Sequence, residues 1–517
     1  MEYEPVIGLE IHAELKTQTK MFCDCKNDPD EKHPNINVCP VCLAHPGTLP
    51  APNKDAIEKV ILVGMALHAE IPERSHFDRK NYFYPDLPKG YQISQYEDPL
   101  VKGGYLEFML SDGSVRHIRI TRVHLEEDTG RLVHGINLAE QRRTNADDRG
   151  NILRNSASSL QKSATLVDFN RAGMPLMELV TEPDIRSAEE ARRFGEELQL
   201  VLRYVGASDA DMEKGQMRVE ANVSVRPKGA KEFGTKVEVK NINSFKFAEK
   251  AIEYEIKRQT EVLEKGGKVI QETRGWDETK GVTFPQRVKE GATDYRYFPE
   301  PDIPPLVLDQ AWLQSIRAKL TELPDAKRRR FAEEYKLDAK TIELFINDPE
   351  LAEYFERVIS EMAEWISSMG DRVERDKAIK LASNYLTSDF QKLRKETEST
   401  VSDTLITPEN FAELAALVYE DKISSAAAKK VLEIMFRAGG DPSEIIRDKN
   451  LGQESSGEML GEIAKQVIAE NPAIAAEIKK GKANAIQALV GSAMKASQGK
   501  GNPTMLRALI EKELGGA

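Results

Sequence analysis

The sequence predicts an α+β protein, with strands and a few helices in its first 298 residues and helices alone after them. Residues 298–305 contain four prolines in eight positions, and this density forbids a continuous helix or a central strand. Before this segment apolar and polar residues alternate, and after it apolar residues recur at helical spacing. We therefore expect a mixed N-terminal part with an antiparallel sheet, followed by a helical part.

The length of 517 residues suggests about three domains. A second boundary is predicted at residues 397–407, which are rich in Ser, Thr and acidic residues. That segment ends in Thr407, a good helix N-cap, directly before Pro408 at the first helical position. We expect domains at 1–298, 299–406 and 407–517, and we expect the last two to be all-helical.

The composition excludes several classes of protein. Hydrophobic residues make up 40% of the chain and charged residues 31%, which is too apolar for a disordered protein. The net charge of −12 argues against a generally basic nucleic-acid coat. Apolar runs fall far short of the ~20 residues of a membrane span, and the first residues lack the positive start of a secretory signal. We expect a soluble, cytoplasmic protein.

The first strand pattern covers residues 9–15, where apolar residues occupy the odd positions. Glu10, His12 and Glu14 therefore share the opposite face. Such a face is common in a half-solvated antiparallel sheet. Two acids beside a histidine nevertheless repel each other across ~7 Å unless a cation lies among them, and both interpretations stay open.

Later elements of the first part repeat this division. A capping box at residues 187–190 opens a helix, which Gly206 ends. Strand patterns at 219–226 and 237–240 each have one apolar and one polar face. The polar faces hold Glu220, Asn222, Ser224, Arg226, Glu238 and Lys240.

The cysteines give the strongest local signal. All four lie in two close pairs, Cys23 with Cys25 and Cys39 with Cys42, separated by thirteen residues. Two thiolate pairs brought together by a loop suit tetrahedral zinc. Free thiols are the alternative, while disulfides need an oxidising compartment and a redox pair would leave two cysteines unexplained. We favour structural zinc.

Residues 122–130 contain three adjacent acids, after a histidine and before a glycine. Such a group suits a hard cation at a strand end, although an acidic run is more often an exposed turn. The apolar parity also shifts within this strand, from Ile118 and Ile120 to Val123 and Leu125. Spacing alone therefore leaves open which acid points inward.

Two further segments are less specific. Residues 77–91 interleave cations with aromatics, and residues 294–298 echo the pattern. Such residues can stack on bases and pair with phosphates, but core aromatics flanked by ion pairs are the favoured interpretation. The polar residues 135–165 lack apolar periodicity and predict a surface loop.

The C-terminal residues 478–512 carry seven cations against one acid, although the chain as a whole is acidic. Segregated positive charge is what phosphate recognition requires. The phosphate-binding motif Gly-x-x-x-x-Gly-Lys-Ser/Thr is absent, as is the Gly-x-Ser-x-Gly motif. The candidate tRNA-binding cations are Lys479, Lys480, Lys482, Lys495, Lys500 and Arg507.

Six ordered motifs together resemble the B subunit of the tRNA-dependent amidotransferase that makes Gln-tRNA(Gln) and Asn-tRNA(Asn). The resemblance runs nearly end to end and includes residues 491–497 and 502–503. The motifs are residues 6–17 (VIGLEIHAELKT), 78–86 (DRKNYFYPD), 91–94 (YQIS), 124–128 (HLEED), 240–244 (KNINS) and 294–302 (DYRYFPEPD).

The resemblance implies an α/β cradle, a helical middle domain and a YqeY-like tail domain that grips tRNA. It also implies a ligase reaction, in which ATP phosphorylates the carboxylate of Glu-tRNA(Gln) or Asp-tRNA(Asn) and ammonia displaces the phosphate. The implied partners are an amidase (the A subunit), which releases ammonia from glutamine, and a small third protein (the C subunit). Divalent metal and cations would stabilise the charge on the transferring phosphoryl group.

The resemblance also assigns roles to residues. It implies that Glu10, His12, Glu127 and Glu178 bind Mg²⁺, and that the cysteines hold zinc. It suggests contacts to ATP or the acyl end, and the candidates are Glu14, Lys80, Arg218, Asn222 and Lys240. The family often has Asp where this chain has Glu220, whose side chain is one methylene longer, so we expect a water-bridged metal contact to be lost or shifted there.

Two rival functions stay open. A non-catalytic RNA-binding adaptor would use the zinc knuckle and the basic tail, but it has no need of clustered carboxylates, which repel phosphates. A metal-dependent nuclease or phosphatase would use the same acids and leave the basic tail unexplained.

Overall fold

The computed structural model describes residues 2–136, 164–288, 295–370, 373–452, 457–479, 483–497 and 501–515. The chain divides into two compact units, residues 1–324 and 325–517. The first unit combines sheets with helices, and every regular element described after it is a helix, which confirms the expected α+β class. The expected surface loop at 135–165 lies largely outside the described residues.

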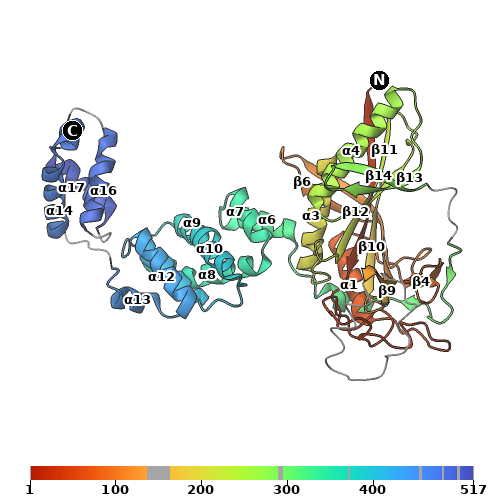
Figure 1. Ribbon diagram of the computed structural model, residues 1–517. Coiled ribbons are helices and arrows are strands. Elements are labelled where there is room, and N and C mark those ends of the chain that lie inside the picture. Colours follow the sequence, from red (N-terminus) through yellow and green to blue (C-terminus); the bar gives the residue numbers. More distant parts are fainter. Residues whose placement is uncertain are drawn as a thin grey trace, which may run out of the picture. The chain divides into compact units, whose positions relative to one another are not determined.

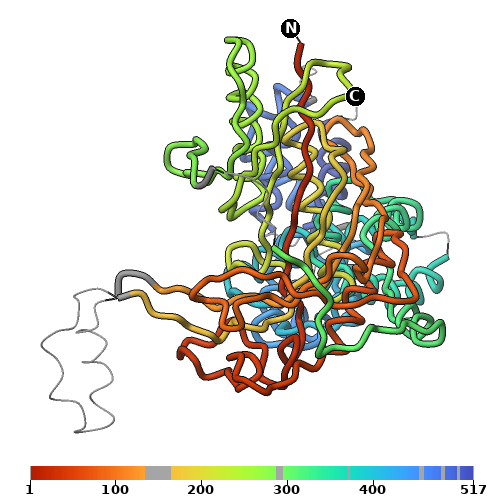
Figure 2. The backbone as a smooth tube through the Cα atoms, turned by 90° about the vertical axis from the view of Figure 1, so that its right-hand side faces the viewer, coloured from red at the N-terminus to blue at the C-terminus, as the bar shows by residue number. Residues whose placement is uncertain are grey.

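A nine-stranded sheet organises the first unit (Figure 1). Its path is β14-β13-β12-β11-β1-β10-β7-β5, with β6 paired to β7, and only the β12–β13 pair is parallel. Figure 2 shows β1, in red, running through the middle of this unit. The strands are β14 (Val282–Val288), β13 (Glu272–Asp277), β12 (Val237–Ile242), β11 (Met217–Pro227), β1 (Tyr3–Glu14), β10 (Pro175–Thr181), β7 (Val115–Glu127), β5 (Val101–Lys102) and β6 (Tyr105–Met109).

Helices cover the apolar face of this sheet, and Figure 1 shows α3 and α4 along one side of it. Leu9 and Ile11 of β1, Phe194 of α3 and Ile252 of α4 belong to one buried core. The Ser187 side chain accepts a hydrogen bond from the Glu190 N–H, which confirms the predicted cap of α3. The helices of this unit are α1 (Lys54–Ala66), α3 (Ala188–Tyr204), α4 (Phe245–Glu264) and α5 (Gln310–Arg317).

The proline-rich segment does not end the first unit. It forms two short edge strands, and edge strands are where proline is tolerated. β15 (Phe298–Pro299) pairs with β3 (Asp78–Asn81), and β16 (Leu306–Val307) pairs with β2 (Arg74–Ser75). The compact unit therefore extends to residue 324, beyond the expected limit at 298. The remaining strands are β4 (Tyr91–Ser94), which pairs with β3, and the pair β8 (Arg131–Ile136) and β9 (Ala164–Asp168).

The second unit is built of helices. Phe331, Phe345 and Phe355 form one aromatic core, and Tyr354 packs on Phe411 of α11. This contact joins α8 and α11 across the expected limit at 406. The elements of this part of the chain are α6 (Pro324–Glu334), α7 (Ala339–Ile346), α8 (Pro349–Met369), α9 (Arg375–Tyr385), the π-helix η2 (Leu386–Phe390), α10 (Gln391–Thr397), α11 (Pro408–Tyr419), α12 (Ser425–Ala438) and α13 (Pro442–Asp448).

The last helices have a small core of their own, which includes Leu460, Leu489, Leu506 and Ile510. The second predicted cap is also present, because the Thr407 side chain accepts a hydrogen bond from the backbone at the start of α11. No helix in the described parts of the chain is both long and apolar enough to cross a membrane. The last elements are α14 (Gly457–Glu470), α15 (Pro472–Lys479), the 3-10 turn η3 (Ala483–Ala485), α16 (Ile486–Ala496) and α17 (Pro503–Glu513).

Candidate active site and cysteine cluster

The central strand β1 presents its polar residues between two neighbouring strands. His12 lies opposite Glu178 of β10 on one side and Arg218 of β11 on the other. Glu10 lies opposite Glu220. Because the odd residues of β1 from Ile7 to Ala13 are buried in the core, the even residues Glu10 and His12 between them face away from it. The alternation predicted for this strand is confirmed.

One group on this face consists of His12, Glu126 and Glu178. The His12 Nε2 atom is 3.5 Å from a carboxylate oxygen of each acid. His124 of β7 lies beside them, with its Nε2 3.3 Å from Glu178. All three ligand atoms lie within 4.8 Å of one another, so one cation could contact all of them. We call these three residues the His12 cluster.

Charge and burial oppose each other in this cluster. Burial disfavours protonated His12, but the hydrogen bond to Glu178 and the charges of Glu178 and Glu126 outweigh burial and raise the pKa of His12. Burial would raise the pKa of Glu178, but His124 and His12 hold that pKa well below its ordinary value. Glu178 therefore stays ionised beside the two histidines.

Lys80 lies close to the same acids. Burial disfavours its ammonium group, but the charges of Glu126 and Glu178 outweigh burial and raise the pKa of Lys80. Its Nζ atom also lies 5.2 Å from the centre of the Tyr295 ring. A fixed positive charge thus lies beside the His12 cluster. The sequence analysis named the same residue, Lys80, as a candidate contact to ATP or the acyl end.

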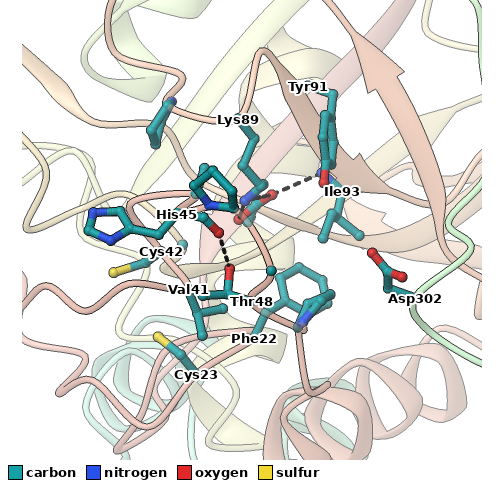
Figure 3. A pocket seen from close by; sticks show the side chains of 17 residues that line it. Phe22, Cys23, Val41, Cys42, His45, Thr48, Lys89, Tyr91, Ile93 and Asp302 are labelled. Atoms are coloured by element: carbon teal, nitrogen blue, oxygen red, sulfur yellow. Dashed lines mark hydrogen bonds and ion pairs between the residues drawn. The ribbon is translucent and has the colours of Figure 1, made fainter.

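Glu127 does not join the cluster. Its carboxylate pairs with Lys89 at 2.6 Å and accepts a hydrogen bond from the Ile93 N–H at 2.9 Å. It lines a cavity of about 270 Å³ beside the cysteines. Figure 3 shows Cys23 and Cys42 on one side of this cavity and Lys89 on the other. The acid of this run that faces His12 is Glu126.

A β-bulge in β7 explains why Glu126, and not Glu127, faces His12. Thr181 pairs with Ile120 and Val180 pairs with Arg122, so β7 contains one additional residue, Thr121, at this position. A bulge of this kind inverts the alternation along a strand. His124 and Glu126 consequently share the polar face, while Glu127 has the opposite parity.

Glu10 belongs to a second group, with Glu220 and Glu238. Here a cation is already present, because Lys240 Nζ lies 2.7 Å from Glu220 and 3.5 Å from Glu238. Burial opposes the charge of Lys240, but these acids raise its pKa. Asn222 donates a hydrogen bond to Glu10 at 2.8 Å. Glu220 stands where the family often has the shorter Asp, and its carboxylate pairs with Lys240.

Glu14 belongs to a third group that sequence reasoning missed. Arg171 donates to both Glu14 and Asp128 at 2.5 Å, and Arg218 lies 3.4 Å from Asp128. Burial would raise the pKa of Asp128, but Arg218 and Arg171 lower it. No spacing in the sequence links Arg171 to β1, because the contact depends on the turn before β10.

The four cysteines meet as predicted. Their sulfur atoms all lie within 4.8 Å of one another, and the Cys39 and Cys42 sulfurs are 3.9 Å apart. Four sulfurs bound to one tetrahedral zinc ion at ~2.3 Å would be about 3.8 Å apart. The hydrogen bond from Cys23 and the nearby Lys20 charge lower the pKa of Cys42 to about 5, against burial. The donor set fits a zinc ion.

Part of the predicted basic tail can be placed. Lys495 on α16 and Arg507 on α17 are exposed, and Arg507 pairs with Glu511 at 3.0 Å. Lys480, Lys482 and Lys500 lie outside the described residues, as does the Lys479 side chain. The proposed phosphate contacts of the tail therefore remain a prediction.

Comparisons with known proteins agree with this organisation. Residues 5–314 match the family described as the GatB/GatE catalytic domain, and residues 370–514 match the GatB domain. The chain is 46% identical over 513 residues to the B subunit of the aspartyl/glutamyl-tRNA(Asn/Gln) amidotransferase of Carboxydothermus hydrogenoformans, and the match covers 99% of both chains. Proteins of the same name from Roseiflexus sp. (strain RS-1) and Thermoanaerobacter pseudethanolicus are each 44% identical, over 99% of this chain and 99% and 100% of theirs.

The part of the chain that carries the mixed sheet and its acidic, histidine-containing face thus matches a GatB/GatE catalytic domain. The matches extend over both units and almost the whole length of the relatives. The chain belongs to the family of B subunits of the aspartyl/glutamyl-tRNA(Asn/Gln) amidotransferases. The expected resemblance and the expected enzyme class, a carbon–nitrogen ligase with glutamine as amide donor, are confirmed.

Proposed function

We propose that this protein catalyses both chemical steps of tRNA-dependent amidation. ATP phosphorylates the side-chain carboxylate of Glu-tRNA(Gln) or Asp-tRNA(Asn), and ammonia then displaces phosphate to leave the amide. Carboxylates are poor electrophiles at neutral pH, so activation must precede attack by ammonia. Positioned charge can stabilise such a phosphoryl transfer without a protein nucleophile.

The His12 cluster is the observation that carries this proposal. Two carboxylate groups and one imidazole fit a divalent cation, and we assign the site for Mg²⁺ to His12, Glu126 and Glu178. A bound cation of this kind neutralises charge on a transferring phosphoryl group. Because histidine is an unusual Mg²⁺ ligand, Mn²⁺ should also bind here.

The neighbouring residues suit the remaining tasks of the site. Lys80 provides a positive charge beside the cluster, and Arg218 lies opposite His12 on β11. We assign both to the phosphates or to the acyl carboxylate. The Glu10 group already contains Lys240, so it fits a phosphate contact through Lys240 better than a second cation.

The proposal extends to partners and location. The site described here contains no glutaminase arrangement, so we propose that an amidase partner, the A subunit, supplies ammonia and that a small third protein, the C subunit, makes the complex a heterotrimer. Substrate tRNA would bind through the basic tail, and the reaction would take place in the cytoplasm. These assignments rest on family membership and on the charge of residues 478–512.

The variants Glu126→Gln and Glu127→Gln are predicted to differ in Mn²⁺ binding, which distinguishes the roles of the two adjacent acids. Glu126 faces His12, whereas Glu127 pairs with Lys89. We expect Glu126→Gln to weaken Mn²⁺ binding by at least about tenfold, and Glu127→Gln to leave it within about threefold. Titration of Mn²⁺ followed by electron paramagnetic resonance measures both. The opposite order would show that Glu127 is the ligand.

The function itself is tested with the complete enzyme, mischarged tRNA and γ-labelled ATP in the absence of ammonia. We expect label transfer to the aminoacyl end in the wild type and its loss in Glu126→Gln, with tRNA binding retained. An adaptor without chemistry would show no transfer that depends on this chain. Retained transfer in Glu126→Gln would reject the assigned site.

Cys23→Ser is predicted to lower the thermal stability of the protein and to leave its ATP affinity unchanged. We propose that Cys23, Cys25, Cys39 and Cys42 hold structural zinc, since the four sulfurs gather with spacing that fits the ion. The variant should lose most of its zinc and unfold at lower temperature, while ATP affinity is spared in the folded fraction. Elemental analysis and thermal unfolding measure this, and full stability without zinc would contradict it.

A further inference from the structure

Lys20 is buried in a position where a lysine is unusual. Its side chain is 1% exposed and ranks among the largest fully buried side chains of the described chain. Its Nζ atom donates to the Asn37 carbonyl at 2.7 Å, to the Phe169 carbonyl at 3.3 Å and to the Cys42 sulfur at 3.8 Å. These three acceptors match the three N–H donors of an ammonium group.

In the part of the chain that the structure describes, no carboxylate serves as counter-ion to the ammonium group. Among the described residues, none supplies a carboxylate oxygen within 4.0 Å of Lys20 Nζ, and two of its three acceptors are neutral carbonyls. Burial of a charge is costly unless an opposite charge compensates for it. The remaining acceptor, Cys42, belongs to the cysteine cluster, which is therefore the nearest source of negative charge.

The zinc-loaded cysteine cluster would carry the negative charge that a buried ammonium group requires. Four thiolates around one divalent ion carry a net charge of −2, so one lysine at the sulfurs reduces it to −1. Cys42 is also the most deeply buried cysteine and accepts a second hydrogen bond, from the Cys39 N–H at 3.2 Å. This is the sulfur at which a neutralising cation has the largest effect, because water screens it least.

We infer that Lys20 is the counter-ion of the zinc-loaded cysteine cluster and that it links zinc to the catalytic sheet. The inference rests on the zinc site proposed above. Lys20 contacts no reacting group described here, so it is a positioning residue. Its ammonium group ties the cluster to the loop between the two cysteine pairs through the Asn37 carbonyl, and to a distant segment through the Phe169 carbonyl.

Through the Phe169 carbonyl, Lys20 is connected to residues 169–174, which form the turn before β10. Gly173 in that turn has φ +83°, and a Cβ atom there would lie 3.4 Å from the Cys42 Cβ and 3.7 Å from the Lys20 Cδ. The Gly173 carbonyl accepts a hydrogen bond from the Met21 N–H at 2.7 Å. The same turn carries Arg171, which bridges Glu14 and Asp128. Loss of zinc should therefore loosen residues 169–174.

The first test compares Lys20→Met with Lys26→Met in the complete enzyme. Methionine keeps a linear side chain and removes the charge. Lys26 follows Cys25 directly, but it is exposed and pairs with Asp28 at 2.6 Å, so it is a matched control. We expect Lys20→Met to weaken zinc binding 10- to 100-fold in competition with a chromogenic chelator, and Lys26→Met to stay within about twofold.

The second test needs no variant. Hydrogen exchange of the wild type, with and without zinc, should show faster exchange at residues 169–174 after zinc removal and little change in α3. Zinc binding by Lys20→Met within twofold of the wild type, or unchanged exchange at 169–174, would overturn the inference and leave the zinc site standing. A wild type that binds no zinc would overturn both.

Discussion

Glu178→Gln is expected to reduce ATP-dependent phosphoryl transfer to mischarged tRNA by about 10²- to 10³-fold, the cost of removing one group aimed at developing charge. Glu178 lies between two histidines and contributes a carboxylate oxygen to the His12 cluster. Glutamine keeps the shape of the side chain but removes its negative charge. The loss should therefore appear in kcat, while tRNA affinity stays near the wild-type value.

Glu182→Gln is the matched control for this prediction. Glu182 directly follows β10 and accepts a hydrogen bond from Thr121 at 2.8 Å, away from His12. The same chemical change there should leave the rate within about twofold. Thermal unfolding of both variants separates lost chemistry from lost structure. A folded Glu178→Gln enzyme that kept more than a tenth of its activity would contradict the assigned role.

Removal of the six tail cations should have the second largest effect, on tRNA binding. If all six contact phosphates, wild-type affinity should fall about 10³-fold between 50 and 200 mM salt. Replacement of all six by glutamine should raise the KM for tRNA and make it nearly independent of salt, because each lost phosphate contact lowers the salt slope by about one. The substituted residues are Lys479, Lys480, Lys482, Lys495, Lys500 and Arg507.

A control with equal charge tests whether position matters. Six exposed cations elsewhere in the second unit, replaced in the same way, change the net charge equally and should change the KM for tRNA little. They are Arg357, Lys377, Lys392, Lys422, Arg437 and Arg447. Equal effects of the two variants would mean that total charge, and not the tail, determines tRNA binding.

Local patterns in the sequence predicted several elements well, because each depends on neighbouring residues. The alternation of β1, the cap of α3 at Ser187 and the cap of α11 at Thr407 all appear as expected. The cysteine cluster forms for a similar reason, since two close pairs need only one loop to meet. These features require no knowledge of distant contacts.

Other features depended on contacts that local patterns do not contain. The bulge at Thr121 decides that Glu126 rather than Glu127 faces His12, and spacing alone left that choice open. The proline-rich segment pairs back onto the first unit through short edge strands. Burial of Lys20 depends on segments more than a hundred residues apart. In each case tertiary pairing, and not local propensity, sets the outcome.

The position of a bound divalent ion tests the central claim most directly. Crystals of the enzyme soaked in Mn²⁺ would locate it by anomalous scattering. We expect one ion about 2.0–2.3 Å from the His12 Nε2 atom and from carboxylate oxygens of Glu126 and Glu178. An ion bound only at the Glu10 group, or no ion on this face of the sheet, would contradict the account.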